Sequence, residues 1–404
     1  MACAELSVTG APLGDLPLHG SFLDAVAKAV ADLAAETSDG GPAILVGAPW
    51  RDGDRVHDAV LLLDGGKVAE MRFAQHPSPP FDAGAPAGPI AVRGVPLGVL
   101  IGAELDDADA AETLRETGAE ILLAPCASPW LAGMPDLRLN LAVARVTETG
   151  LPLAWLNLLG GQEEALFDGG AFVLNGDCSL AVQAEAFAPG LFAARFRRGP
   201  GGWACATGSL APPPEGEAAL YRVLLLALAD RLAKGGCSAV ALCGGEQPGA
   251  ALLAALAADL LGPDGLRDGP GPGVLGLATC DKTGLALGHA GTDGDFAPLR
   301  DLWAGELRRL GRWRNRQSSA GTTEPAVPEA ALTEPGSDPD PVLAALLDNG
   351  RAAYGQDAEA YETALLAAEG CRRRVPPGPR LSRTAFGRDR RYPVVAELPG
   401  RPAG

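Results

Sequence analysis

The sequence predicts an α/β protein with two main domains, and three observations lead to this fold class. Short apolar runs that fit buried strands alternate along the first half with stretches whose apolar residues have helical spacing. A Pro-Pro-Pro tract at 212–214 interrupts this alternation, and a shorter strand–helix–strand pattern follows it. The 404 residues are 47% hydrophobic, which is enough for packed cores and excludes wholesale disorder.

Each element of the first half follows from a local pattern. Residues 22–35 have apolar side chains at helical spacing, and 43–47 form a short apolar run typical of a buried strand. Asp64-Gly65-Gly66 separates two further apolar runs, 59–63 and 68–72, and predicts a β-hairpin, because glycine adopts the positive φ of a tight turn. The remaining predicted strands are 97–101, 120–125, 152–158, 171–175 and 180–186, and the remaining predicted helices are 108–117 and 137–149.

The second half begins with a strong helical pattern and continues as a small βαβ unit. The predicted elements are helix 217–233, strand 238–242, a glycine loop, helix 250–261 and strand 274–278. The residues 318–341 are rich in Pro, Ser, Thr and Gly and predict a flexible linker. Helices are predicted at 342–349 and 358–369. The predicted domains are therefore 1–210 and 211–317, followed by the linker and by a region 342–404 of helices and an arginine-rich tail.

Charge and cysteine content exclude several function classes. The net charge of -17 opposes binding to nucleic acid phosphates and to anionic lipid, so we expect neither a nucleic acid nor a membrane partner. The eight cysteines form no C-x-x-C pair and no His cluster accompanies them, so we expect neither a metal site nor a disulfide framework. Scattered thiols and the absence of a recognisable signal peptide favour a cytoplasmic location.

The positive charges are unevenly distributed. Nine arginines lie between Arg372 and Arg401, against two acidic residues. Such a run is typical of a solvated face or an inter-subunit contact, and it could also bind a phosphate-bearing small molecule. The sequence leaves these alternatives open.

Long segments of the chain, in the same order, resemble glutamine-dependent NAD synthetases. They are AELSVTGAPLGDLPL from Ala4, ILLAPCASPW from Ile121, PDLRLNLAVARVTETGLPLAWLNLLGGQEEALFDGGAFVLN from Pro135, DKTGLALGHAGTDGDFAPLRDL from Asp281, RWRN from Arg312 and PGPRLSRTAFGRDRRYP from Pro377. The resemblance implies a nitrilase-like αββα sandwich that lacks its first strand. A reduced PP-loop domain, related to the adenine nucleotide alpha hydrolases, would follow it.

In the glutaminase domain, the resemblance implies that the base is kept and the other reactive groups are lost. Glu5 matches the family's general base, Ala74 stands where the family has its lysine, and Gly102 stands where it has its nucleophilic cysteine. Without sulfur no thioester can form, so the family's glutamine hydrolysis should be absent. Cys126, after the next strand, is either a relocated nucleophile or a small buried thiol.

The PP-loop is also altered. A loop of the form S-G-G-x-D-S surrounds pyrophosphate with backbone amides and a serine at a helix N-terminus. Here residues 243–248 read CGGEQP, so Gly244 and Gly245 are kept while both hydroxyls and the aspartate are gone. Glu246 adds negative charge, and Pro248 removes an N–H donor. The loop is therefore either a vestigial phosphate site or a plain strand-to-helix turn.

The family's nucleotide site is kept only in fragments. Lys282 and Asp295 match family positions, whereas Gly284 replaces an acidic residue. The turn-rich loop 262–273 stands in place of a long segment that forms much of the adenylate pocket in the family.

These losses predict a pseudoenzyme, a non-catalytic scaffold that acts by protein association. Its expected partner is a second copy or another protein, including an active NAD synthetase. We expect no bound cofactor, and ATP and Mg²⁺ only if ligase activity is retained. A residual or altered NAD synthetase-type ligase, a glutamine-binding sensor and a decaying paralogue without a role remain as alternatives.

Overall fold

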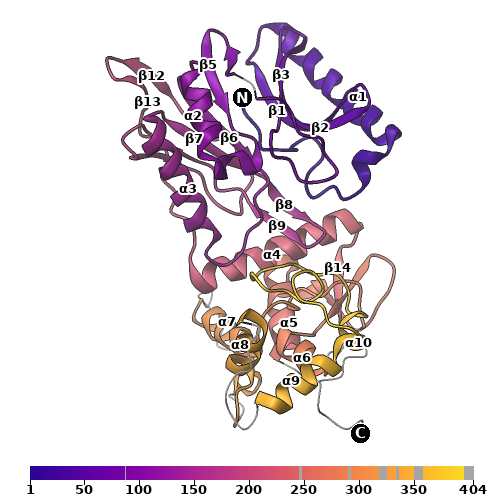
Figure 1. Ribbon diagram of the computed structural model, residues 1–404. Coiled ribbons are helices and arrows are strands. Elements are labelled where there is room, and N and C mark those ends of the chain that lie inside the picture. Colours follow the sequence, from indigo (N-terminus) through magenta and orange to yellow (C-terminus); the bar gives the residue numbers. More distant parts are fainter. Residues whose placement is uncertain are drawn as a thin grey trace. The chain divides into compact units, whose positions relative to one another are not determined.

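The chain folds into two compact units, Met1–Pro214 and Glu215–Gly404, which divide at the end of the Pro-Pro-Pro tract. The computed structural model in Figure 1 describes residues 1–86, 88–244, 248–289, 293–317, 325–333, 336–349 and 358–394. Each unit has its own sheets and its own apolar clusters, so each is described by itself.

The first unit begins with an antiparallel sheet of three strands, β1 (Ile44–Asp52), β2 (Arg55–Asp64) and β3 (Lys67–Phe73). The predicted hairpin joins β2 to β3 through Gly65 and Gly66, which have φ of 61° and 82°. Only glycine adopts such values without strain. Helix α1 (Gly20–Glu36) packs its apolar stripe on one face of this sheet.

A second sheet of six strands has the order β11-β10-β7-β6-β5-β4. Its strands are β4 (Ile90–Val92), β5 (Val95–Val99), β6 (Ile121–Cys126), β7 (Leu153–Asn157), β10 (Phe172–Leu174) and β11 (Leu180–Gln183). Strands β5, β6 and β7 are parallel, as the intervening helices α2 (Ala108–Glu116) and α3 (Met134–Thr149) require. Both helices cover the outer face of this sheet, as Figure 1 shows.

The two sheets pack face to face, which gives four layers in the order α, β, β, α. Side chains alternate along β2: Ala59 and Leu61 face α1, whereas Val60 and Leu62 face Val99 of the second sheet. The N-terminal residues lie beside β1, where Ala2 forms a parallel bridge with Leu45. This bridge positions the segment that carries Glu5 between the layers.

Two hairpins of this unit were not predicted. They are β8 (Leu159–Gln162) with β9 (Ala165–Asp168), and β12 (Phe196–Gly199) with β13 (Gly202–Cys205). Both contain glycine pairs, which weaken a strand pattern, and β12 carries two exposed arginines. The local sequence of these two hairpins therefore predicts loops and not strands.

The second unit is built on a small parallel sheet of order β15-β14-β16. Strands β14 (Ala239–Cys243) and β16 (Val274–Ala278) flank helix α5 (Pro248–Leu261) in the chain, as predicted, and α4 (Gly216–Gly235) precedes them. The segment 262–273, expected to be only loop, includes the two-residue strand β15 (Leu266–Arg267).

The C-terminal helices belong to the core of this unit. Helices α6 (Lys282–Leu287), α8 (Asp340–Asn349) and α9 (Ala358–Ala367) share one apolar cluster with Phe386, which follows α10 (Glu369–Arg372). Helices of the predicted C-terminal region 342–404 thus contribute to the core of the second unit.

Two apolar side chains in the described part of the predicted linker 318–341 contact the core of this unit. Val327 and Leu332 are buried, and Val327 exchanges two hydrogen bonds with Asn315 of α7 (Ala304–Arg316).

Among the described helices of the chain, none is long and apolar enough to cross a membrane.

Candidate functional site

Gly102 lies at a sharp turn where the chain leaves β5 and enters a short 3₁₀ helix, Gly102–Asp106. Its φ is 54°, in the left-handed region that favours glycine. The turn is held by Glu104, whose Oε2 accepts the N–H of Ile101 at 2.8 Å. This strand-to-helix turn would expose a side chain at its apex, as nucleophile turns of other enzymes do.

Glu5 fills the space where a side chain on residue 102 would lie. A Cβ placed on Gly102 would stand 2.6 Å from Glu5 Oε1 and 2.8 Å from Oε2. The carboxylate is held there by the backbone N–H of Ala127, which donates to Oε2 at 2.6 Å. The positions that the sequence assigns to the base and to the nucleophile are therefore in contact. The carboxylate of Glu5 lies in the space that a side chain at position 102 would fill.

Ala74 lies just beyond the end of β3, on the side that faces the second sheet. It is 2% exposed and packs in one apolar cluster with Ile101 and Leu123. Its N–H donates to the carbonyl of Asp58 at 2.8 Å. The next residue, Gln75, donates its N–H to Glu104 Oε1 at 2.6 Å, so position 74 lies beside the same turn as Gly102. A methyl group at this point cannot stabilise an oxyanion.

Sequence reasoning missed a buried ion pair between the two sheets. Arg72 Nη1 lies 2.6 Å from Glu104 Oε2, and both side chains are almost completely buried. Glu104 receives this bond and two backbone N–H bonds, whereas Nε and Nη2 of Arg72 have no acceptor among the described residues. The pair holds β3 to the turn at Gly102.

Asp58 was also missed, and it lies against Glu5. Asp58 is 3% exposed, and its Oδ1 has no hydrogen-bond partner among the described residues. Burial raises the pKa of Glu5, and burial together with the Glu5 charge raises the pKa of Asp58 well above its usual range. Both shifts favour the protonated forms of these carboxyl groups.

The alternation of inward and outward side chains along β2 is a sequence signal that could have predicted the buried position of Asp58. Asp58 has the same parity as Val60 and Leu62, which face the second sheet. A carboxyl group in a buried apolar strand requires a partner.

Cys126, the alternative nucleophile, ends β6 close to this cluster. Its Sγ lies 4.0 Å from the carbonyl oxygen of Gly102. Burial has the largest effect on the pKa of the Cys126 thiol and raises it. The negative charge of Glu5 raises it further. Arg138 opposes this shift, but it is paired with Asp168 through two bonds of 2.7 and 2.9 Å. The thiol is therefore protonated near neutral pH and is a weak nucleophile.

In the second unit, Gly244 follows β14 with a φ of 138°, and a Cβ here would stand 2.4 Å from Thr279 Oγ1. Gly245 and Glu246 lie outside the described residues. Helix α5 begins at Pro248, which has no N–H to offer. Burial has the largest effect on the pKa of Cys243, at the end of β14, and raises it. The charges of Asp295 and Asp293 raise this pKa further. The surroundings of this turn are therefore acidic.

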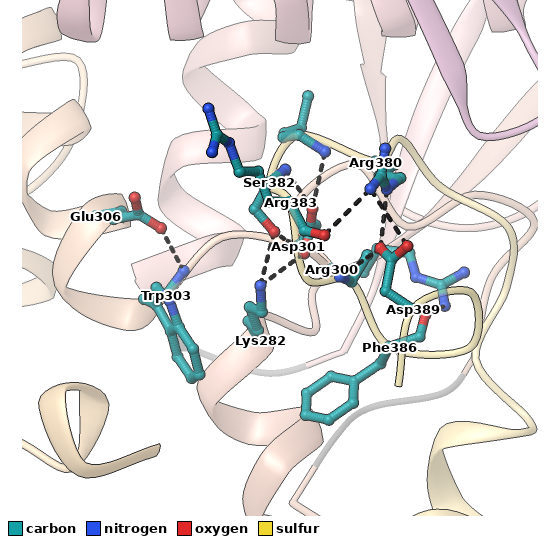
Figure 2. Close-up of polar contacts among 12 residues, drawn as sticks. Lys282, Arg300, Asp301, Trp303, Glu306, Arg380, Ser382, Arg383, Phe386 and Asp389 are labelled. Atoms are coloured by element: carbon teal, nitrogen blue, oxygen red, sulfur yellow. Dashed lines mark hydrogen bonds and ion pairs between the residues drawn. The ribbon is translucent and has the colours of Figure 1, made fainter. Parts of the chain in front are cut away.

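Lys282 is fully engaged within the second unit (Figure 2). Its Nζ lies 2.9 Å from Asp301 Oδ1 and 2.8 Å from Ser382 Oγ, and 5.1 Å from the centre of the Trp303 ring. Asp301 also accepts the N–H groups of Leu381 and Ser382 and the hydroxyl of Ser382. The pair thus ties the C-terminal segment to the core.

Asp295 has a similar structural role. Its Oδ2 accepts the N–H of Gly276 at 2.9 Å, and its own N–H donates to Gly276 O at 2.7 Å. The structure does not bring Lys282 and Asp295 together by any hydrogen bond or ion pair between described residues.

No protein-family model matches the chain. The glutamine-dependent NAD(+) synthetase of Rhodobacter capsulatus is 31% identical to it, in an alignment that covers 98% of this chain and 92% of the relative. This chain belongs to the glutamine-dependent NAD synthetase family. The enzyme of the same name from Xanthomonas campestris is 27% identical, with coverage of 98% and 91%.

Two solved glutamine-dependent NAD synthetases share the fold. The protein from Acinetobacter baumannii, solved with ADP, superimposes with a TM-score of 0.74 at 22% identity, over 97% of this chain and 91% of its own. The protein from Cytophaga hutchinsonii has a TM-score of 0.73 at 13% identity, over 98% and 91%. The predicted resemblance to glutamine-dependent NAD synthetases is confirmed. The predicted fold class, a nitrilase-like domain followed by a PP-loop domain, is also confirmed.

Within this NAD synthetase fold, the candidate site residues fall into two groups. Gly102, Ala74 and Glu5 surround one turn of the nitrilase-like domain. In the PP-loop domain, Lys282 and Asp295 each make interactions that hold the fold together.

Proposed function

We propose that this chain is a non-catalytic NAD synthetase-type protein that acts by associating with other protein chains. The observation that carries the proposal is the contact between Glu5 and the α-carbon of Gly102, where a carboxylate fills the place of a nucleophile. Hydrolysis of glutamine by the family route needs a thiolate at that point, a base beside it and a cation for the oxyanion.

The surroundings of Gly102 support this proposal. Ala74 provides no cation, and the guanidinium of Arg72 is paired with Glu104. Cys126 is buried, and its raised pKa keeps it as a thiol near neutral pH. Burial raises the pKa of Glu5 itself. None of these groups offers a thiolate with a cation beside it.

The PP-loop domain points in the same direction. A magnesium-bound polyphosphate needs N–H donors, positive charge and carboxylate ligands. Pro248 lacks the N–H, the charges of Asp293 and Asp295 oppose phosphate, and Lys282 is neutralised by Asp301. Among the described residues there is no group of three or more His, Cys, Asp or Glu side chains that could hold a metal ion. These residues do not fit ATP with Mg²⁺.

The second candidate is an ATP-dependent, amide-forming ligase with residual or altered activity. Its support is the family membership and the ADP-bound state of the Acinetobacter baumannii relative. Titration calorimetry with ATP and Mg²⁺ distinguishes the candidates, since a ligase must bind the nucleotide and the proposed scaffold releases no heat with it.

The direct test supplies the purified chain with ATP, Mg²⁺ and nicotinic acid adenine dinucleotide, and with either glutamine or ammonium as nitrogen source. We expect no NAD above a heat-inactivated control with either source. NAD formed from ammonium alone would support the ligase candidate. NAD formed from glutamine would overturn the non-catalytic proposal for both domains.

A further inference from the structure

The guanidinium of Arg72, between the two sheets of the first unit, has part of its hydrogen-bonding capacity unused. Its Nη1 donates to Glu104 Oε2 at 2.6 Å, and the side chain is almost completely buried. Its Nε and Nη2 are also buried and have no acceptor among the described residues. These two N–H groups lie along one edge of the planar guanidinium, so a single acceptor can bind both. Since buried donors are nearly always paired, we expect an acceptor beside this edge.

Asp58 has a complementary atom on the neighbouring strand. It is 3% exposed, and its Oδ1 is buried without a hydrogen-bond partner in the part of the chain that the structure describes. Val60 of β2 lies opposite Arg72 of β3 in the ladder, and Asp58 precedes Val60 by two residues. Asp58 and Arg72 are therefore diagonal neighbours, and both face the second sheet.

Position 74 lies between these two side chains. Ala74 is opposite Asp58, because its N–H donates to Asp58 O at 2.8 Å. The carboxylate of Glu104 accepts from Arg72 and, at 2.6 Å, from the N–H of Gln75. Since one carboxylate contacts both residues, the guanidinium extends along β3 past Ala74, which has only a methyl group. The space above this methyl group is therefore bordered by Arg72 on one side and by Asp58 on another.

We propose that a buried water molecule binds above Ala74 and bridges Arg72 to Asp58. The water oxygen accepts the N–H groups of Nε and Nη2, and one of its O–H groups donates to Asp58 Oδ1. These three hydrogen bonds are the number typical of a buried water, and they supply partners to all three atoms. This inference goes beyond the proposed function, because it concerns how the two sheets are joined and not whether glutamine is hydrolysed.

The charges around position 74 favour a neutral molecule over an ion. An anion would be repelled by Glu104, and a cation would meet the unused N–H groups of Arg72. A neutral molecule that both donates and accepts hydrogen bonds suits Arg72 and Asp58 together. Water is the smallest such molecule, and the burial of both side chains favours a small occupant.

The first test is a crystal structure of the wild-type chain at a resolution that shows ordered water. We expect electron density for one water oxygen within about 3.2 Å of Asp58 Oδ1 and of Arg72 Nη2. A direct hydrogen bond between Arg72 and Asp58 would overturn the proposal. Continuous protein packing with no density between the two side chains would also overturn it.

A matched pair of substitutions tests the same site in solution. Serine and cysteine differ little in size, but only the serine hydroxyl forms strong hydrogen bonds. A hydroxyl at position 74 can bond to the partners of the water or to the water itself. Ala74→Ser should therefore unfold at a higher urea concentration than Ala74→Cys, with a reducing agent present. At one urea concentration, the unfolding constant should be about threefold to tenfold smaller for the serine variant, the effect of one hydrogen bond.

The control pair is Ala59→Ser and Ala59→Cys. Ala59 is adjacent to Asp58 but faces α1 in a cluster of apolar side chains. A buried hydroxyl in apolar surroundings is unfavourable, so here the cysteine variant should be the more stable. If cysteine is more stable than serine at both positions, position 74 is as apolar as position 59 and the proposal is wrong. None of these results depends on glutamine hydrolysis or NAD formation, so failure here leaves the non-catalytic proposal to its own assay.

Discussion

The carboxylate of Glu5 lies against the α-carbon of Gly102, 2.6 Å from where a Cβ would be. This contact joins the N-terminal segment to the turn that follows β5. It also fills the space that a side chain on residue 102 would occupy. The stability and the chemistry of the nitrilase-like domain both depend on it.

The first prediction concerns that contact. Gly102→Ala should destabilise the chain by about 2 to 5 kcal/mol, since the methyl group displaces Glu5 from its hydrogen bonds and the left-handed φ adds strain. The control is Gly14→Ala, because Gly14 has a φ of 52° and nothing within 4 Å of its Cβ position. It should cost only about 1 to 2 kcal/mol. Urea unfolding measures both, and equal costs would contradict the predicted contact.

The second prediction concerns the raised pKa values of Glu5 and Asp58. Their raised pKa values mean that the folded state holds protons which the unfolded state has already released. Stability should therefore fall as pH rises from the usual carboxyl range, about 4, toward the raised values. Asp58→Asn should flatten this slope and stabilise the chain above that range by about 1 to 3 kcal/mol, since its amide donates to Glu5.

Thermal unfolding between about pH 4 and pH 9 measures this slope. Asp54→Asn, which alters an exposed carboxylate in the β1–β2 turn, is the matched control and should leave the slope unchanged. A wild-type stability that rises with pH throughout, or an Asp58→Asn variant less stable at every pH, would contradict the raised pKa values of Glu5 and Asp58.

The third prediction concerns the Arg72–Glu104 pair. Arg72→Met leaves a buried carboxylate without its cation and should cost about 3 to 5 kcal/mol. Adding Glu104→Gln should recover part of this loss, because the remaining charge is removed. The solvent-exposed pair of Arg93 and Asp64 is the comparison, and Arg93→Ala should destabilise the chain far less than Arg72→Met. Additive losses at Arg72 and Glu104 would argue against a direct interaction.

The fourth prediction concerns Asp301 in the PP-loop domain (Figure 2). Asp301→Ala leaves the buried ammonium of Lys282 without a carboxylate partner and removes the hydrogen bonds that hold the segment around Ser382. It should therefore lower the free energy of unfolding by about 3 to 5 kcal/mol. Trypsin should then cleave after Arg380 or Arg383 much faster than in wild type. Asp268→Ala, an exposed change in the same unit, is the control. Unchanged cleavage would mean that Asp301 does not anchor this segment.

The sequence allowed the fold to be predicted where local patterns decide it. The Asp64-Gly65-Gly66 turn and the apolar runs of β5, β6 and β7 are local signals, and they led to a layered α/β domain. The Pro, Ser and Thr content of the segment around Val327 predicts a linker, and the sequence does not show that Val327 and Leu332 are buried.

The candidate site could be predicted only in part. The absence of sulfur at Gly102 and of an amine at Ala74 is visible in the sequence. The roles of Asp58 and Arg72 are not, because each depends on a partner at least 32 residues away along the chain. The filling of position 102 by Glu5 depends in the same way on tertiary packing.

The most direct test of the central claim is release of glutamate from glutamine by the purified wild-type chain, beside Cys126→Ala. With Glu5 in the place of a nucleophile and Cys126 held as a thiol, neither protein should release glutamate above the uncatalysed rate. Sustained release by wild type that Cys126→Ala abolishes would contradict the claim, since a reactive sulfur would then be present in the site.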